Sequence, residues 1–419
     1  MTDRTVLVIA YYFPPMGLSG VLRTVKFVKY LADYGWKPIV LTNTPHSYYA
    51  YDETLLAQLE NRNIEIYRTP PKKHFFGSKR TGLKKSPGFF RRNIIQKIAN
   101  RFYKPDTAIR WHKAALTEVE EILRNHTINI VLTTAPPFSD FLITDEIADR
   151  YGLPFIVDYR DSWADNPDSP FHSSRNETLE ARILARAAKA VVTTRYAKEM
   201  LLRRYRMLTH EDVIILPNGF DTEDFSRTSP THKSNSTFVI THCGVFQDEC
   251  TPKYFMKALA AFLKKNPNAA SQIEARFVGT MKPNHAKLIK KYGLESVVTC
   301  TGYVPHSEAV QAMKESDALW LMSVSAERMP GKLSEYIGAL KPILVCSPEG
   351  TIRKTALETK SAIATPVRDV AQIEKAIATL FEQWQNNSLP KPNPGYASQY
   401  EIKLLTSDLS RELAIAARM

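Results

Sequence analysis

The sequence lacks the features that would place it in several common classes. No apolar run is long enough to cross a bilayer, and the first residues lack the apolar region and small-residue cleavage site of a signal peptide. The four cysteines show neither CxxC spacing nor a paired framework. We therefore expect a cytoplasmic protein with reduced thiols rather than an exported or membrane-spanning one.

Acidic residues are missing from 72–104, a segment filled with lysine, arginine and aromatic residues in a chain of net charge +13. Such a segment suits an anionic surface, such as lipid headgroups, a lipid pyrophosphate or nucleic acid. If 91–103 is helical, Ile94, Ile98 and Phe102 share one face, as in a helix that lies on an anionic membrane. A solvated basic loop packed on its own domain is the alternative. No nucleic-acid-binding motif accompanies the charge, so we expect no nucleic-acid partner.

Strands and helices are predicted to alternate along the chain. The first apolar run, TVLVIAYY, is typical of a parallel strand covered on both faces, and VLRTVKFVKYLADYGW has helical spacing. A second series starts at TFVITHCGVF, after the polar stretch SRTSPTHKSNS. We predict an α/β protein of two Rossmann-like doubly wound domains, 1–222 and 223–395, that face each other across a cleft. A C-terminal helix at about 396–419 is expected to pack back on the first domain.

The loop after the first strand reads FPPMGLSGVLR rather than GxGxxG, which disfavours a nicotinamide or flavin cofactor. Gly17, Ser19 and Gly20 would still let the backbone approach a ligand, with Arg23 one helical turn further on. An ordinary strand-to-helix turn is the alternative. We favour a ligand, because the first loop of such a sheet faces the binding crevice.

A second candidate position follows the strand FIVDYR, where Arg160, Asp161 and Trp163 come at its C-terminal end. Asp161 could orient an acceptor hydroxyl or accept its proton. The alternative is an Arg–Asp pair that only caps the strand.

The most informative stretch is ERMPGKLSEYIGALKPIL, at 327–344. Pro330 and Gly331 form a turn into a helix, whose first N–H groups make an anion site together with Lys332. Glu335, one turn into the helix, can accept two hydrogen bonds from a ribose diol, and Glu327 can accept hydrogen bonds from sugar hydroxyls. The alternative is that both carboxylates merely complement the helix N-terminus.

These segments resemble retaining glycosyltransferases of the GT-B fold, in particular a family-4-like bacterial group that uses nucleotide-sugar donors. The similarity runs nearly end to end and includes PDTAIRW, TTAPPFSD, DYRDSW, LPNGFD, THCGVF, FVGT, TGYVPHSEA and PGKLSEYIGALKPIL. The family's paired glutamates, separated by seven residues, fall on Glu327 and Glu335. By resemblance, Glu335 would bind the ribose, Glu327 the donor sugar and Lys332 the diphosphate.

The resemblance extends the candidate site over both domains. It implies a loop beneath the phosphates at Gly244 and Phe246, and a nucleobase pocket at Gly302, Tyr303 and Val304. The expected donor-binding residues are Gly17, Ser19, Gly20, Gly244, Phe246, Lys253, Gly279, Tyr303, Val304, Pro330, Gly331, Lys332, Leu333 and Glu335. Asp161 and Glu327 are the expected catalytic residues, and no residue is expected to ligate a metal.

One position departs from the family pattern. Relatives usually carry Arg or Lys after the glycine of the first loop in the C-terminal domain, where it pairs with the diphosphate. Here that register falls on Cys250, and Lys253 stands three residues later. We therefore keep open a second hypothesis, a GT-B-shaped protein that binds a nucleotide or glycan without transferring sugar.

The resemblance implies a specific reaction. We expect transfer of a sugar, with retention of anomeric configuration, from a UDP-linked donor to a glycan or lipid-linked acceptor in bacterial surface polysaccharide or glycoconjugate synthesis. No cofactor and no bound metal are expected, because the helix dipole and basic side chains neutralise the leaving diphosphate. We expect a cytoplasmic location, with 72–104 able to contact the inner face of the cell membrane.

Overall fold

The computed structural model describes residues 4–17, 19–45, 50–69, 105–164, 174–227, 236–246 and 249–418. The chain divides into two compact units, Met1–Pro217 with Lys403–Met419 (unit 1) and Asn218–Ile402 (unit 2). The predicted membrane-binding segment 72–104 lies outside the described residues.

Unit 1 contains a parallel sheet whose strands, within the described residues, run in the order β3-β2-β1-β4-β5-β6-β7. The strands are β1 (Arg4–Ile9), β2 (Trp36–Asn43), β3 (Glu65–Thr69), β4 (Ile130–Ala135), β5 (Phe155–Tyr159), β6 (Lys189–Val192) and β7 (Val213–Ile215). β1 pairs with β2 on one side and β4 on the other. Nearly every side chain of β1, β4 and β5 is buried, because helices cover both faces of the sheet.

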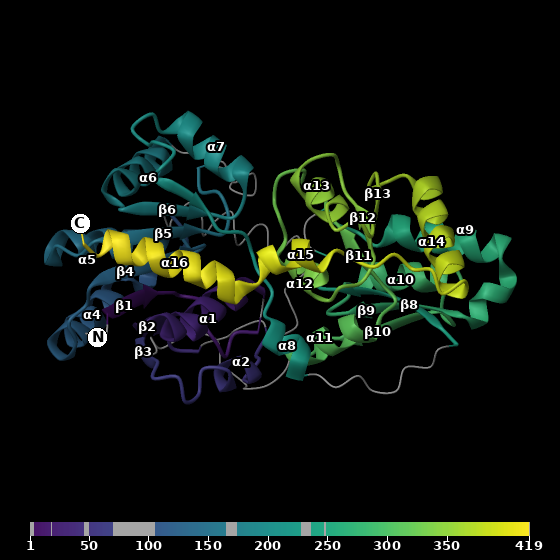
Figure 1. Cartoon of the computed structure of the whole chain (residues 1–419), viewed down its shortest axis with the longest axis horizontal. Helices are drawn as coiled ribbons and strands as arrows, with labels where there is room; N and C mark the ends of the chain where they lie inside the picture. The colour runs from purple at the N-terminus through teal and green to yellow at the C-terminus, as the bar shows by residue number, and fades with distance from the viewer. Residues whose placement is uncertain are drawn as a thin grey trace. The chain divides into compact units, whose positions relative to one another are not determined.

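The helices of unit 1 follow the strands in alternation (Figure 1). They are α1 (Ser19–Leu31), α2 (Thr54–Ala57), α4 (His112–Asn125), α5 (Ser139–Tyr151), α6 (Ser174–Arg186) and α7 (Arg195–Arg204), with 3-10 turns η1 (Ala32–Tyr34) and η2 (Thr107–Trp111). The C-terminal helix α16 (Ile402–Ala416) contacts the same unit. Trp36 Nε1 donates to Ser410 Oγ at 3.1 Å, and Tyr34 Oη donates to the Lys403 carbonyl at 3.0 Å.

Unit 2 has a parallel sheet in the order β10-β9-β8-β11-β12-β13. Its strands are β8 (Phe238–Cys243), β9 (Ile273–Val278), β10 (Val298–Gly302), β11 (Ala318–Met322), β12 (Ile343–Cys346) and β13 (Ala362–Thr365). Its helices are α8 (Thr222–Arg227), α9 (Lys253–Lys265), α10 (Pro283–Lys291), α11 (His306–Glu315), α12 (Gly331–Gly338), α13 (Thr351–Leu357), α14 (Val370–Gln385) and α15 (Pro394–Ala397), with 3-10 turns η3 (Pro267–Ser271) and η4 (Ser398–Tyr400).

The core of unit 2 is centred on Trp320 of β11. Its ring stacks on Phe255 of α9 with centroids 4.0 Å apart, and Phe277 of β9 meets it edge-on at 5.8 Å. Burying such aromatic side chains contributes on the order of 2–3 kcal/mol each. The apolar residues of α9 therefore fix this helix on the sheet.

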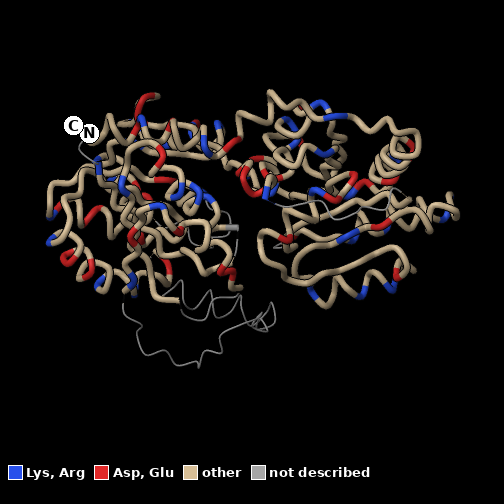
Figure 2. The backbone as a smooth tube through the Cα atoms, turned by 60° about the horizontal axis from the view of Figure 1, so that its bottom comes forward, with Lys and Arg blue, Asp and Glu red and all other residues tan. Residues whose placement is uncertain are grey.

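The predicted fold class, α/β with two Rossmann-like domains, is confirmed. Both sheets are parallel, and helices separate successive strands in each unit. Basic and acidic residues are interspersed along the described part of both units (Figure 2). Within the described residues, no helix is long and apolar enough to span a membrane.

Candidate functional site

In unit 2, the crevice expected of a doubly wound sheet lies at the carboxyl ends of β8 and β11. These two strands are neighbours in the sheet although β9 and β10 come between them in the chain, and β9 and β12 lie on their outer sides. Loops that leave such neighbouring strands diverge, and ligands of doubly wound proteins bind between them. The sequence-predicted residues Gly244 and Phe246 follow β8, whereas Glu327, Pro330 and Gly331 follow β11.

Glycines let three strand ends approach one another at this edge of the sheet. Gly244 donates its N–H to the Val278 carbonyl at 2.7 Å, and Gly279 donates to the Gly302 carbonyl at 2.9 Å. Gly244, Gly279 and Gly302 have φ of 138°, 131° and 74°. A Cβ on Gly279 would lie 2.5 Å from the Gly244 carbonyl oxygen. Gly279 is therefore required by backbone packing beneath the β8 loop.

The helix α12 opens at this edge with an N-terminus that no side chain caps. Pro330 is its N-cap residue, with φ −66° and ψ 139°. Leu333 points into the core and is fully buried. Two contacts hold the helix in place: the Tyr336 hydroxyl accepts the N–H of Cys243 in β8 at 2.7 Å, and Ser334 Oγ donates to the Asn218 carbonyl at 2.6 Å. The first turn thus offers N–H groups and a helix dipole to an anion.

Glu335 is held by two cationic or hydrogen-bonding side chains. Its Oε2 lies 2.9 Å from Lys332 Nζ, and its Oε1 lies 2.6 Å from His306 Nε2. Burial raises the pKa of the Glu335 carboxyl, but Lys332 and His306 outweigh it and lower that pKa to about 2. Burial lowers the pKa of Lys332, but the Glu335 carboxylate raises it by more, so the net shift of the Lys332 pKa is upward. Both side chains are therefore charged at neutral pH.

The loop from β11 to α12 is fixed by hydrogen bonds within the loop and by one from α13. Ser325 Oγ accepts the N–H groups of Glu327 and Arg328 at 3.2 and 3.1 Å. The N–H of Thr351 donates to the Ala326 carbonyl at 2.8 Å. These contacts hold the backbone of Glu327 in place while its side chain remains exposed.

Phe246 packs into the unit 2 core instead of lining the edge. It is 3% exposed, and its ring stacks on His242 with centroids 4.3 Å apart. His242 Nδ1 donates to the Trp320 carbonyl at 3.0 Å. Burial lowers the pKa of His242 to about 4, so the imidazole is neutral at pH 7.

Other expected donor-binding residues lie around the same edge. Tyr303 and Val304 follow β10 and are half-buried. Lys253 opens α9 and is exposed, with Nζ 5.5 Å from the centre of the Tyr254 ring. Cys250 is half-buried and packs against the unit 2 core. Their roles in binding stay predictions.

In unit 1, the predicted first loop is closed by internal hydrogen bonds. Gly17 donates its N–H to the Ala50 carbonyl at 3.0 Å, and Ser19 is the first residue of α1. The Arg160 guanidinium donates to the carbonyls of Gly20 and Pro136. A Cβ on Gly20 would lie 3.1 Å from Arg160 Nη1, so this glycine accommodates the arginine.

Arg23 takes part in a buried ion pair and does not point toward the loop. Its Nη2 lies 2.9 Å from Asp158 Oδ1, and the same guanidinium donates to the carbonyls of Leu216 and Pro217 at 2.9 and 2.7 Å. Thr134 Oγ1 also donates to Asp158 at 3.0 Å. Asp161 is half-buried, just beyond β5. The Arg23 guanidinium is therefore engaged by partners within unit 1.

The structure brings Gly331, Lys332 and Glu335 together with Gly244 at one edge, and it adds residues that sequence reasoning assigned no role. His306 contacts Glu335, and Asn218 Nδ2 donates to the Met329 carbonyl at 3.3 Å. Both belong to segments quoted for the resemblance, TGYVPHSEA and LPNGFD. Within the described ranges, no group of three or more His, Cys, Asp or Glu side chains has the arrangement of a metal site.

Comparison with known proteins identifies the family. Residues 21–224 match the model of Glycosyltransferase Family 4, and residues 224–393 match that of Glycosyl transferases group 1. No curated protein matches the chain in sequence. Among solved structures, HepE of Anabaena in complex with UDP and glucose is similar, with 14% identity, TM-score 0.67, and 98% of this chain and 100% of that one covered.

Two further structures show the same fold. Sucrose-phosphate synthase from Thermosynechococcus elongatus has 13% identity and TM-score 0.66, over 99% of this chain and 100% of that one. WaaG, a glycosyltransferase involved in lipopolysaccharide biosynthesis, has 15% identity and TM-score 0.62, over 97% and 98%. The two family models together span 21–393, and the chain therefore belongs to the glycosyltransferases of the GT-B fold, with a family 4 N-terminal half and a group 1 C-terminal half.

Proposed function

We propose that this chain transfers a sugar from a UDP-linked donor, with retention of anomeric configuration, to a glycan or lipid-linked acceptor in bacterial surface polysaccharide or glycoconjugate synthesis. The observation that carries the proposal is the charged pair of Lys332 and Glu335 at the uncapped start of α12. A cation and free N–H groups suit a diphosphate, and a fixed carboxylate suits a ribose diol.

The donor is taken to be UDP-linked because similar structures were solved with UDP, with UDP and glucose, or with UDP-glucose. Lys332 and the first N–H groups of α12 would take up the negative charge of the departing diphosphate, so no bound metal is needed for that task. Retention follows if the acceptor hydroxyl attacks C1 from the face that the diphosphate leaves. The C1–O bond to the diphosphate breaks, the new C1–O bond forms, and the hydroxyl proton passes to the leaving phosphate.

The acceptor assignment has two supports. One similar structure, WaaG, is a glycosyltransferase involved in lipopolysaccharide biosynthesis. The basic and aromatic composition of 72–104 suits an anionic lipid surface. We assign the protein to the cytoplasm, with peripheral contact to the inner face of the cell membrane. Loss of vesicle binding when the basic residues of 72–104 are changed to serine would support this location, and unchanged binding would contradict it.

The donor proposal is tested by titrating UDP, GDP and ADP into the full chain with EDTA present, followed by turnover of the matching sugar nucleotides. UDP binding is expected, and Glu335→Ala should weaken it at least about tenfold, since a hydrogen bond to a charged group contributes about 1.5–3 kcal/mol. Glu382→Ala, at an exposed glutamate of α14, is the matched control and should change nothing. Tight UDP binding without turnover, even with lipid-linked acceptors, would favour a non-catalytic binder. Product anomer analysis by NMR tests retention.

A further inference from the structure

The carboxylate of Glu335 is the end of a chain of side chains from three helices. Asp224 of α8, His306 of α11 and Glu335 of α12 have side chains that are 8%, 10% and 8% exposed. His306 Nε2 is 2.6 Å from Glu335 Oε1, and its Nδ1 is 3.7 Å from Asp224 Oδ2. The imidazole therefore stands between two buried carboxylates and presents one nitrogen to each.

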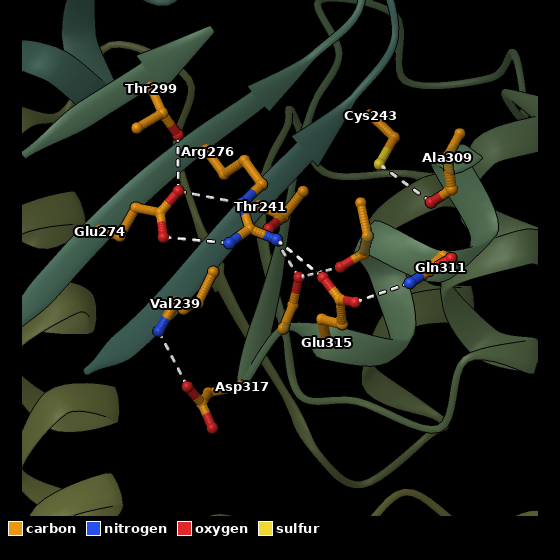
Figure 3. Close-up of polar contacts among 12 residues, drawn as sticks. Val239, Thr241, Cys243, Glu274, Arg276, Thr299, Ala309, Gln311, Glu315 and Asp317 are labelled. Carbon is orange, nitrogen blue, oxygen red and sulfur yellow. Dashed lines mark hydrogen bonds and ion pairs between the residues drawn. The ribbon is translucent and has the colours of Figure 1, made fainter. Parts of the chain in front are cut away.

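His306 approaches Glu335 from a helix whose C-terminal end is fixed to the sheet. It is the first residue of α11, whose last residue, Glu315, accepts from Arg276 of β9 at 3.3 Å. Ser316, just beyond the helix, donates to Thr241 Oγ1 of β8 at 2.6 Å. Figure 3 shows these contacts, with Arg276 between Glu274 and Glu315. The helix that carries the imidazole is thus attached to β8 and β9 of the sheet.

The helix that carries Asp224, α8, is attached to α11. Lys314 Nζ of α11 donates to the Phe225 carbonyl of α8 at 2.6 Å. In addition, the ring of Phe220 lies against α12 where Gly338 has no side chain: a Cβ there would be 2.3 Å from the ring. The segment LPNGFD and α8 therefore brace both α11 and α12 within unit 2.

A glutamate needs such bracing if it is to bind a diol. The terminal torsion of a free glutamate side chain is broad, so its carboxylate plane is not fixed by rotamer preference. A carboxylate offers about four lone-pair sites, and His306 and Lys332 occupy one on each oxygen. One acceptor site therefore remains on each oxygen, in a plane that the two contacts define.

We propose that His306, backed by Asp224, is a positioning residue that orients the Glu335 carboxylate toward the two hydroxyls of a ribose cis-diol. The assignment rests on the proposed function. His306 does not touch the ligand itself, so its effect appears as discrimination between nucleotides with and without a complete diol. A purely structural role would weaken binding of both nucleotides equally.

The test compares UDP with 2′-deoxy-UDP by titration calorimetry of the full chain. Wild-type protein should prefer UDP about tenfold or more, since one hydrogen bond to a charged acceptor is lost with the 2′-hydroxyl. His306→Gln keeps an N–H donor near Nε2 and should retain most of the preference. His306→Asn places its amide near Nδ1, too short to reach Glu335, and should reduce the preference to about threefold or less. His210→Ala, an exposed histidine of unit 1, is the control.

The outcomes separate the two proposals. A wild-type chain that does not bind UDP overturns the proposed function and this assignment with it. UDP binding with the same preference in His306→Asn as in wild type overturns the assignment alone, and so does an equal loss of affinity for both nucleotides. Asp224→Asn removes the second carboxylate and should lower the preference less than His306→Asn does. Gln and Asn differ by one methylene. If His306→Asn loses the preference for UDP and His306→Gln retains it, general unfolding cannot be the cause.

Discussion

The two units place basic side chains near the carboxyl ends of their central strands, but they use them differently. In unit 1, Arg23 is 6% exposed and is bonded to Asp158 and two carbonyls, and Arg160 donates to two further carbonyls. In unit 2, the Lys332 side chain is 21% exposed and pairs with Glu335. A basic residue after a parallel strand therefore indicates an anion site only where the fold leaves its charge accessible.

Buried carboxylates show the same contrast. Burial raises the pKa of Asp106 and of Asp140 in unit 1, although hydrogen bonds from backbone N–H groups oppose it. Burial also raises the pKa of Glu335 in unit 2, but Lys332 and His306 reverse the sign. In unit 1 burial thus shifts these two carboxyl groups toward the neutral form, whereas in unit 2 the neighbouring side chains keep Glu335 charged.

The largest expected effect is on the stability of unit 1. Arg23→Ala would leave the Asp158 carboxylate buried without its guanidinium, which typically costs about 3–5 kcal/mol. Urea unfolding should show this loss, while the UDP affinity of the remaining folded protein stays within about twofold of wild type. A loss of UDP affinity with unchanged stability would mean that Arg23 serves the donor after all.

The next effect concerns the glycine contact in unit 2. Gly279→Ala would place a Cβ 2.5 Å from the Gly244 carbonyl at a φ of 131°, and we expect a loss of about 2–4 kcal/mol together with weaker UDP binding. Gly293→Ala is the matched control. Its φ is also positive, at 64°, but no atom lies within 4 Å of the added Cβ, so about 1 kcal/mol should be lost. Equal losses in the two variants would refute the role of close packing.

The contrast between Arg23 and Lys332 explains how much of the site could be predicted from sequence. Periodicity and turn residues identified the strands, and the helix expected after the turn at Pro330 and Gly331 is α12, Gly331–Gly338. Lys332 and Glu335 are three residues apart on one helix, so their proximity follows from local geometry. By contrast, Asp158 is 135 residues from Arg23, and local spacing carries no information about that pair.

The same limit applies to the contacts that sequence reasoning missed. His306 reaches Glu335 across 29 residues, and Asp224 reaches His306 from the far side of the unit 2 sequence. Phe246 was expected in the loop beneath the phosphates, which stays a prediction, but its stacking on His242 could not be predicted from local spacing. Hydrophobic periodicity shows that a side chain is buried, and it does not name the partner against which it packs.

Acid should therefore affect the two units differently. The pKa of His242 is about 4 in the folded chain, below its ordinary 6.5, so its contribution is present above pH 6.5 and is lost as pH falls to 4. The pKa of Glu335 is about 2 against 4.5, so its contribution is lost between pH 4.5 and 2. Each loss is on the order of 3 kcal/mol. In unit 1, the raised pKa values of Asp106 and Asp140 act in the opposite direction, since protonation relieves their burial.

All four cysteines lie in unit 2, which allows its unfolding to be followed alone. Cys243 and Cys346 are buried and can be labelled as urea unfolds the unit, with a disulfide reagent that reacts in acid. The urea concentration at half-labelling should decrease as the pH is lowered from 6.5 to 4. His242→Gln should flatten that part of the profile and leave the part below pH 4.5. A midpoint that is independent of pH in wild type would contradict the assignment of a neutral, buried His242.

The smallest effects concern the two lysines that could meet a diphosphate. Lys332→Ala should weaken UDP binding about tenfold and uridine binding by a smaller factor, since UDP loses a charge-assisted phosphate contact in addition to the contact that orients Glu335. Lys253 is exposed, and it stands three residues after Cys250, where relatives usually carry the base. An exposed lysine that pairs in water contributes about 0–1 kcal/mol, so Lys253→Ala should weaken UDP binding by less than about fivefold.

The double variant Lys332→Ala/Lys253→Ala decides whether the second lysine replaces the missing base. If the two act on the same diphosphate, their effects on log Kd will not add, because each lysine compensates for loss of the other. If Lys253 is only a surface residue, the double variant will match Lys332→Ala alone. Lys257→Ala, on the same helix α9 and also exposed, is the control for a general change in surface charge. A tenfold loss in Lys253→Ala alone would show that unit 2 makes a second phosphate contact. Its charge would then come from the first residue of α9 and not from the preceding loop, where relatives carry the base.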